Sequence, residues 1–198
     1  MIVSLSTGQA VSKSKAMSRP DLCLEFANTR YWRGQPAPTE SLNAPEDLAA
    51  WMASNVSKEA RPLSRREFER ALELRETIYR VFDATARGKP PAGSDLAALN
   101  GELGSAPPRA VLRRERAGFA WDVDLRATTA PAALAPVLWS AGDLLTGERL
   151  ARVKRCANPE CGWLFLDDSR AGRRRWCSMA SCGNRAKAKR HYHRSREE

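Results

Sequence analysis

Two short cysteine pairs, Cys156-Ala-Asn-Pro-Glu-Cys161 and Cys177-Ser-Met-Ala-Ser-Cys182, lie within residues 151–198, the tail of the sequence. Both pairs have the pattern C-x4-C, and the segment 162–176 separates them. Each pair can form a tight knuckle, and the intervening segment can bring the knuckles together around one tetrahedral metal ion. The spacing therefore predicts a metal-stabilised module in the tail.

Zinc suits four thiolates in a tetrahedral array, and a complete shell leaves no position for a reactive water, so the site is predicted to be structural. Two disulfides are the competing interpretation. We disfavour them because the opening residues lack the apolar stretch of a secretion signal and the cytosol keeps thiols reduced. His191 and His193 are better explained by nucleic-acid contact or solvent exposure than as extra ligands. Cys23 is interpreted as a small buried apolar residue, with a reactive thiol as the alternative.

Positive charge is concentrated in the same part of the sequence. The whole chain has 33 Lys and Arg against 23 Asp and Glu, which gives a net charge of +10, and the tail contributes +8 of it. Such a concentration predicts a polyanionic partner. No apolar run approaches the roughly 18–20 residues of a bilayer span, so we expect no membrane partner and a cytoplasmic location.

The tail is expected to contain a knuckle, a β-hairpin and a C-terminal helix in a treble-clef-like arrangement. Residues 163–166 predict a strand, 167–172 a turn and 173–177 a return strand. Few large apolar side chains are present in the tail, so it cannot form a self-sufficient core, and zinc would supply the missing stability.

The segment after the last cysteine predicts a helix to about Arg196. At 100° per residue its basic side chains fall on one arc, while Ala188 and Tyr192 lie opposite and can pack on the hairpin. We expect Arg185 or Lys189 to reach base edges and the other basic residues to meet phosphates. The predicted nucleic-acid contacts are Arg173, Arg174, Arg175, Arg185, Lys187, Lys189, Arg190 and Arg194.

Residues 152–194 resemble the CGNR zinc finger, named after the residues that stand here as Cys182, Gly183, Asn184 and Arg185. The resemblance implies that the four cysteines bind one Zn²⁺ and that the finger binds DNA in stress-response transcription regulators. In that family the finger follows an ABATE domain. Residues 20–150 are similar to one, from Phe26-Ala-Asn-Thr to Leu74-Arg-Glu and in the order of the domains.

Residues 20–150 predict a mainly α-helical domain with one β-hairpin, an α+β class, between a flexible leader at 1–19 and the zinc finger at 151–198. A helix is slightly favoured over a strand at 21–30, and 33–39 is expected to be a loop. Alternation over 109–126 predicts the hairpin. Further helices are expected behind capping residues at Asn43 (with Glu46), Ser64 (with Glu67), Ser94, and Thr128 or Thr129, the last continuing to near Gly147.

Residues 1–150 carry no motif for catalysis: both histidines lie in the tail, and there is no glycine-rich phosphate loop and no nucleophile elbow. We therefore expect that the protein is not an enzyme. Glu25, Asn28 and Arg30 could line a ligand pocket, although a structural role, with Asn28 and Thr29 as capping or turn residues, is favoured over the pocket. Trp32 and Trp51 are more simply explained as core residues.

A DNA-binding transcriptional regulator is the leading hypothesis, with an N-terminal half that senses a ligand or partner and a zinc finger that presents a basic helix to double-stranded DNA. An RNA-binding or ribosome-associated factor is the second hypothesis, because the same charges suit RNA and Trp163 or Trp176 could stack on bases. A zinc-stapled protein-interaction module is the third. The sequence leaves open whether a small-molecule effector exists and whether the chain forms a homodimer.

Overall fold

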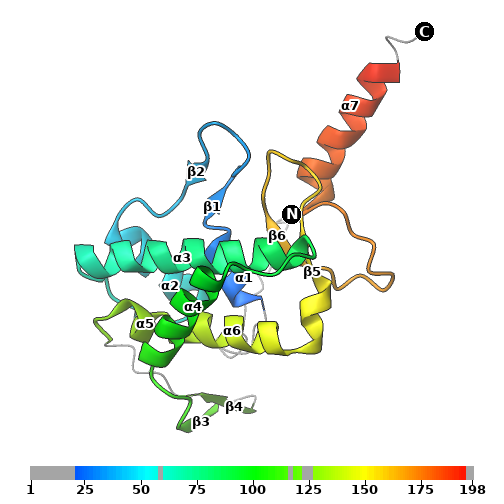
Figure 1. Ribbon diagram of the computed structural model, residues 1–198. Helices are drawn as coiled ribbons and strands as arrows, with labels where there is room; N and C mark the ends of the chain where they lie inside the picture. The colour runs from blue at the N-terminus through cyan, green and yellow to red at the C-terminus, as the bar shows by residue number, and fades with distance from the viewer. Residues whose placement is uncertain (1–20, 58–59, 116–117, 122–126, 195–198) are drawn as a thin grey trace, which may run out of the picture.

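The computed structural model describes residues 21–57, 60–115, 118–121 and 127–194 (Figure 1). Helices form the body, and the strands of the described residues pair as three antiparallel two-stranded ribbons. The predicted leader at 1–19 lies outside the described residues, so that expectation stays a prediction.

A short helix, α1 (Leu22–Ala27), lies at the centre of the body, and five of its six residues are buried. It packs between the long helix α3 (Arg65–Ala86) and α6 (Ala135–Thr146). Helix α2 (Pro45–Asn55) and helix α4 (Gly93–Ser105) pack on α3. The apolar faces of these helices form one core, which confirms the prediction of a mainly helical domain and of a helix at 21–30.

Two of the predicted helix caps are wrong by one or two residues. Helix α2 is capped at Ala44, because the Asp47 carboxylate accepts hydrogen bonds from the amides of Asn43 and Ala44 at 2.8 and 3.0 Å. Helix α4 begins at Gly93 behind Ala92, so Ser94 is inside the helix.

The Ser64 cap of α3 is confirmed, since its hydroxyl accepts from the Glu67 amide. The Glu67 carboxylate does not complete a capping box, because it does not accept a hydrogen bond from the Ser64 amide. It accepts instead from the amide of Ala130, at the start of α5 (Ala130–Ala133), and so joins two helices.

The single helix predicted behind Thr129 is divided into α5 and α6, with Leu134 between them. Pro136 has no amide hydrogen to bond the carbonyl four residues earlier, so the chain cannot run through this point as one regular helix. The predicted hairpin is confirmed as β3 (Leu112–Glu115) paired with β4 (Gly118–Trp121); residues 122–126 lie outside the described part.

The strand pairing predicted for the tail is wrong. Strand β6 (Leu164–Leu166) pairs with β5 (Val153–Arg155), which follows the 3₁₀ turn η2 (Glu148–Arg152), and not with residues 173–177. The reason is burial: Val153, Leu164 and Leu166 belong to the same core as α1 and α3, whereas 173–175 are three exposed arginines. The ribbon β5–β6 thus closes one side of the helical body.

A second short ribbon joins β1 (Arg30–Tyr31) to β2 (Thr39–Glu40) across the predicted loop. At the C-terminal end, a wide π turn η3 (Met179–Gly183) leads into α7 (Asn184–Arg194), which projects from the body (Figure 1). The predicted helix is confirmed up to Arg194. Its predicted packing face is not, because Ala188 and Tyr192 are exposed.

Candidate metal centre and nucleic-acid interface

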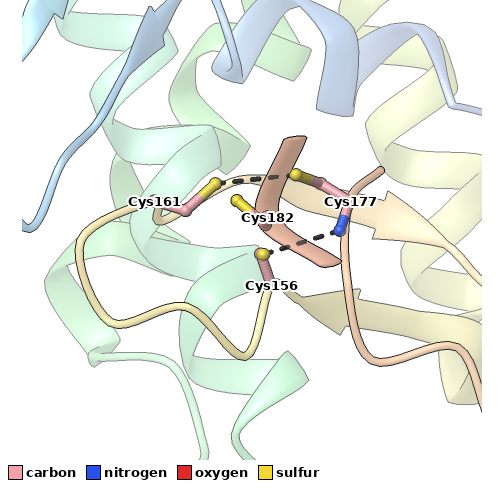
Figure 2. A group of neighbouring side chains, drawn as sticks. All are labelled: Cys156, Cys161, Cys177 and Cys182. Atoms are coloured by element: carbon pink, nitrogen blue, oxygen red, sulfur yellow. Dashed lines mark hydrogen bonds between the residues drawn. The ribbon is translucent and has the colours of Figure 1, made fainter. Parts of the chain in front are cut away.

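The four tail cysteines converge on one point between β5, β6 and η3 (Figure 2). All four sulfur atoms lie within 4.8 Å of one another, and the sulfurs of Cys161 and Cys177 are 3.7 Å apart. Zinc–sulfur bonds of about 2.3 Å in a tetrahedron require sulfur–sulfur distances of about 3.8 Å. The cluster therefore has the size and ligand type for one structural Zn²⁺. A disulfide requires about 2.05 Å, and all five cysteines of the chain are free thiols here.

Backbone hydrogen bonds shape the first knuckle. The Cys156 amide donates to the Trp163 carbonyl at 2.8 Å, and the Cys161 amide donates to the Asn158 carbonyl at 3.0 Å. The Asn158 side chain accepts from the Glu160 amide and donates towards the Cys182 sulfur at 3.5 Å. Gly162 closes the turn with φ of +71°, which a residue with a Cβ adopts only with strain.

A buried carboxylate organises the loop that leads to the second knuckle. Asp167 accepts hydrogen bonds from Lys154, from Ser169 and from the Arg174 amide. The bond from Lys154 and those from Ser169 hold the pKa of this carboxyl well below its usual range. This network replaces the predicted strand pairing and carries the chain back to Cys177, whose amide points at the Cys156 sulfur at 3.5 Å.

The surroundings of the cluster favour the protonated form of two of its thiols when no cation is bound. Burial raises the pKa of Cys156, and the neighbouring Cys177 thiol together with burial raises the pKa of Cys161. Protons would therefore stay on these sulfurs unless a divalent cation replaced them, which is what Zn²⁺ does at four-cysteine sites. Bound zinc supplies cross-linking of the two knuckles.

The metal centre is joined to the helical body by contacts that the sequence does not reveal. The amides of Arg33 and Gly34 donate to the carbonyls of Cys161 and Glu160 at 3.2 and 3.1 Å. The Tyr79 hydroxyl donates to the Gly162 carbonyl at 2.9 Å. The turn after β1 is therefore pressed against the first knuckle.

Asn28 makes the most buried of these contacts. Its side chain is 5% exposed, donates to the Leu164 carbonyl at 2.8 Å and accepts from the Leu164 amide at 3.0 Å. Both Leu164 groups face away from β5, so the Asn28 amide occupies the place that a third strand would take. Asn28 is also the C-cap residue of α1, which confirms its interpretation as a capping residue, but neither that interpretation nor the pocket interpretation predicted the contact with Leu164.

A network of charged side chains lies between β1, β2 and α3. Arg75 is 2% exposed and forms a two-pronged ion pair with Glu40 at 2.6 and 2.7 Å. Glu76 pairs with Arg33 at 2.7 Å and with Arg75 at 3.0 Å. Burial raises the pKa of Glu40 and Glu76, but the hydrogen bonds and charges of the arginines outweigh it and lower both.

A hollow of about 590 Å³ opens beside this network. Arg30 lines it, whereas Glu25 and Asn28 do not, so the three predicted pocket residues are not brought together. The Arg30 side chain is 39% exposed and reaches Glu76 at only 3.7 Å. The remaining lining residues are Glu40, Leu72, Glu73, Arg75, Glu76, Thr77 and Arg80.

The predicted nucleic-acid residues fall into three groups. Lys187 and Lys189 are exposed on α7, and Arg173 is exposed on the loop before the second knuckle. Three others hold contacts within the chain: Arg174 donates to the carbonyls of Trp176 and Cys177, and Arg175 and Arg185 lie over the rings of Trp176 and Trp32. The side chains of Arg190 and Arg194 lie outside the described part of the structure.

Cys23 is fully buried in α1, its amide donates to the Ser140 hydroxyl, and burial raises the pKa of its thiol to about 12. This confirms its interpretation as a small core residue. Within the described ranges, no helix is both long and apolar enough to cross a bilayer.

Two family models match the chain and together cover most of it. The ABATE model, described as "Putative stress-induced transcription regulator", matches residues 20–148, and the CGNR zinc finger model matches residues 152–195. Neither is a family of enzymes. No curated protein matches the sequence.

Proposed function

Because this chain belongs to the ABATE family and ends in a CGNR zinc finger, we propose that it is a zinc-dependent transcriptional regulator that binds double-stranded DNA through α7. The ABATE body would sense a ligand or partner, and the zinc centre would hold α7 in place. Reduced thiols at all five cysteines suit work in the cytoplasm.

The observation that carries this proposal is the projection of a basic helix from the metal centre (Figure 1). Helix α7 begins two residues after the ligand Cys182 and packs mainly against the turn η3; Arg185 at its base lies over the Trp32 ring, and the rest of the helix projects away from the body. A helix about 10–12 Å across fits the DNA major groove, which is about 12 Å wide. Lys187 and Lys189 would face the DNA, with Arg190 and Arg194 added on the basis of sequence alone.

Selection of genomic fragments by the full-length, zinc-loaded protein tests the proposal. We expect enrichment of a defined site by the wild type and its loss with Cys177→Ser, which removes a metal ligand. Equal enrichment by both proteins would contradict a role for zinc, and no enrichment by either would contradict DNA binding.

Salt dependence measures the electrostatic part of binding. If about five phosphates are neutralised, log affinity should fall against log salt with a slope of about −4 to −5. Arg173→Gln should reduce the magnitude of that slope by about 1. Arg66→Gln is the matched control, because Arg66 is also exposed but lies in the first turn of α3, at the opposite end of the body (Figure 1).

Competition with structured RNA separates the main alternative. Trp163 and Trp176, the candidates for stacking on bases, pack against the cysteine cluster and are partly buried, which favours DNA over RNA. Tighter binding to RNA than to duplex DNA would reverse this choice. Absence of binding to both at low salt would support a protein-interaction module instead.

The hollow beside Arg30 is our candidate for effector binding. Arg30 and Glu73 line it and bring opposite charges to its rim, so a small zwitterionic molecule could pair one group with each. A screen of zwitterionic metabolites for thermal stabilisation, repeated with Arg30→Gln, tests this assignment. A hit that stabilises both proteins equally would place the effector elsewhere.

A homodimer is proposed through the ribbon β3–β4. Leu112 and Phe119 are 57% and 75% exposed, and a two-stranded ribbon is only marginally stable alone. Strand β4 carries no charge, so two copies could meet there despite a net charge of +10 on each chain. Sedimentation of the wild type and Phe119→Ser tests the proposal, and a wild-type monomer at high concentration would refute it.

A further inference from the structure

We infer that the turn 32–34, directly after β1, is the joint through which the ABATE body sets the direction of α7, with Trp32 and Arg185 as its two positioning residues. The inference rests on the proposed DNA binding by α7. It reassigns Arg185 from a contact with DNA to a contact with the body of the protein.

Trp32 has an unfavourable backbone conformation, which persists only because tertiary contacts hold it. Its φ is +54°, and it is the one described non-glycine residue with a positive φ. A bulky side chain is rarely found in this region, and such residues cluster where geometry serves a function. The Trp32 side chain packs against the group formed by Cys156, Cys161, Phe165 and Cys182.

The two residues after Trp32 bind the turn to the first knuckle on one side and to α3 on the other. The amides of Arg33 and Gly34 bind the first knuckle, while the Arg33 guanidinium binds Glu76 and lies 3.7 Å from the centre of the Tyr79 ring. The fit is close: a Cβ on Gly34 would lie 2.1 Å from the Pro159 carbonyl oxygen. A shift of α3 or of Glu76 would therefore move the metal centre as well.

Arg185 connects this turn to the helix. It is the second residue of α7, and its guanidinium carbon lies 4.5 Å from the centre of the Trp32 ring, within the range of a cation–π interaction. The helix extends for about 15 Å beyond this anchor. A tilt of about 10° at its base would displace its far end by about 2.5 Å, enough to change how its basic side chains meet the phosphates.

A double-mutant cycle with the full-length, zinc-loaded protein and its selected DNA fragment tests the joint. Arg185→Gln and Trp32→Leu should each weaken binding about two- to fivefold, and the double variant should be no weaker than the weaker single one. Trp32→Phe retains an aromatic face and should restore most of the loss. Lys187→Gln, the control on the same helix, should add its effect to that of Trp32→Leu.

Salt slope and zinc content distinguish the alternatives. Arg185→Gln should leave the slope unchanged, whereas Lys187→Gln should reduce its magnitude by about 1. Additive effects of Trp32→Leu and Arg185→Gln, together with a reduced slope for Arg185→Gln, would show a direct phosphate contact and overturn the joint. Arg185 is exposed, so its variant should fold and retain zinc even if Trp32→Leu does not.

Failure of the proposed function itself would look different. If the wild type binds no nucleic acid, the joint is judged by hydrogen exchange in the first turns of α7, which Arg185→Gln should accelerate and Lys187→Gln should not. Equal exchange in wild type and Arg185→Gln would overturn the joint independently of DNA.

Discussion

Replacement of Asn28 by alanine should destabilise the protein even though the residue is not a metal ligand. The change removes the two hydrogen bonds between the Asn28 amide and the backbone of Leu164. It leaves the Leu164 N–H and C=O groups buried without partners, at about 1–3 kcal/mol each. We expect a total loss of about 3 kcal/mol, which for a chain of this length lowers the melting temperature by about 6–12 °C.

Thermal and urea unfolding of the zinc-loaded protein measure this effect. Asn100→Ala is the matched control, because Asn100 is exposed on α4, and its unfolding free energy should change by less than about 0.5 kcal/mol. Asn28→Asp retains the acceptor but turns a carboxylate oxygen towards the Leu164 carbonyl, so it should destabilise at least as much as alanine. A melting temperature for Asn28→Ala equal to that of Asn100→Ala would refute the reasoning.

Three further outcomes are expected. Cys177→Ser should lose the single bound zinc and Cys23→Ala should keep it, as measured by native mass spectrometry; retention by the serine variant would contradict the four-ligand site. Tyr79→Phe should lower the unfolding free energy by about 1 kcal/mol through loss of its bond to the first knuckle, and an unchanged urea midpoint would argue against that bond. Because the pKa of Glu40 is lowered in the folded state, the stability that its pair with Arg75 contributes is present above about pH 4.3 and is lost as pH falls through the folded pKa. The stability difference between wild type and Glu40→Gln should therefore shrink on acidification in urea titrations, and a difference independent of pH would exclude this carboxylate as the source.

The metal ligands could be predicted because their information is local. The spacing within the two C-x4-C pairs indicates by itself that the four sulfurs meet at one site, independently of the structure of the rest of the chain. Helix α3 could also be predicted from the sequence, since its apolar residues recur at helical spacing behind the Ser64 cap.

The pairing of β6 could not be read in the same way. Its partner β5 contains only one apolar residue, Val153, followed by two charged residues, and so carries no strand pattern. Residues 173–177 follow a turn directly after β6, which favours them as the return strand when sequence alone is considered. Burial in a core shared with α1 decided the pairing, and that core depends on residues far away in the sequence.

The contacts of Asn28, Trp32 and Arg33 are hidden for the same reason. An Asn after a short helix predicts a cap or a turn, and nothing nearby indicates that its partner is Leu164. A tryptophan gives no local sign of a positive φ. The joint between body and finger is a property of the tertiary structure alone.

The central position of α1 has a consequence for how the protein is made. Among the described helices this one leaves the ribosome first, and of its partners only α3 follows soon after: the Cys23 amide binds Ser140, and Asn28 binds Leu164, both of which come much later. A nascent chain cannot complete the burial of α1 until β6 has also emerged, and the last zinc ligand, Cys182, follows later still. Synthesis therefore leaves this mostly apolar segment incompletely buried until the zinc finger is being made, which makes the folding of the body slow and exposes the segment to aggregation in the meantime.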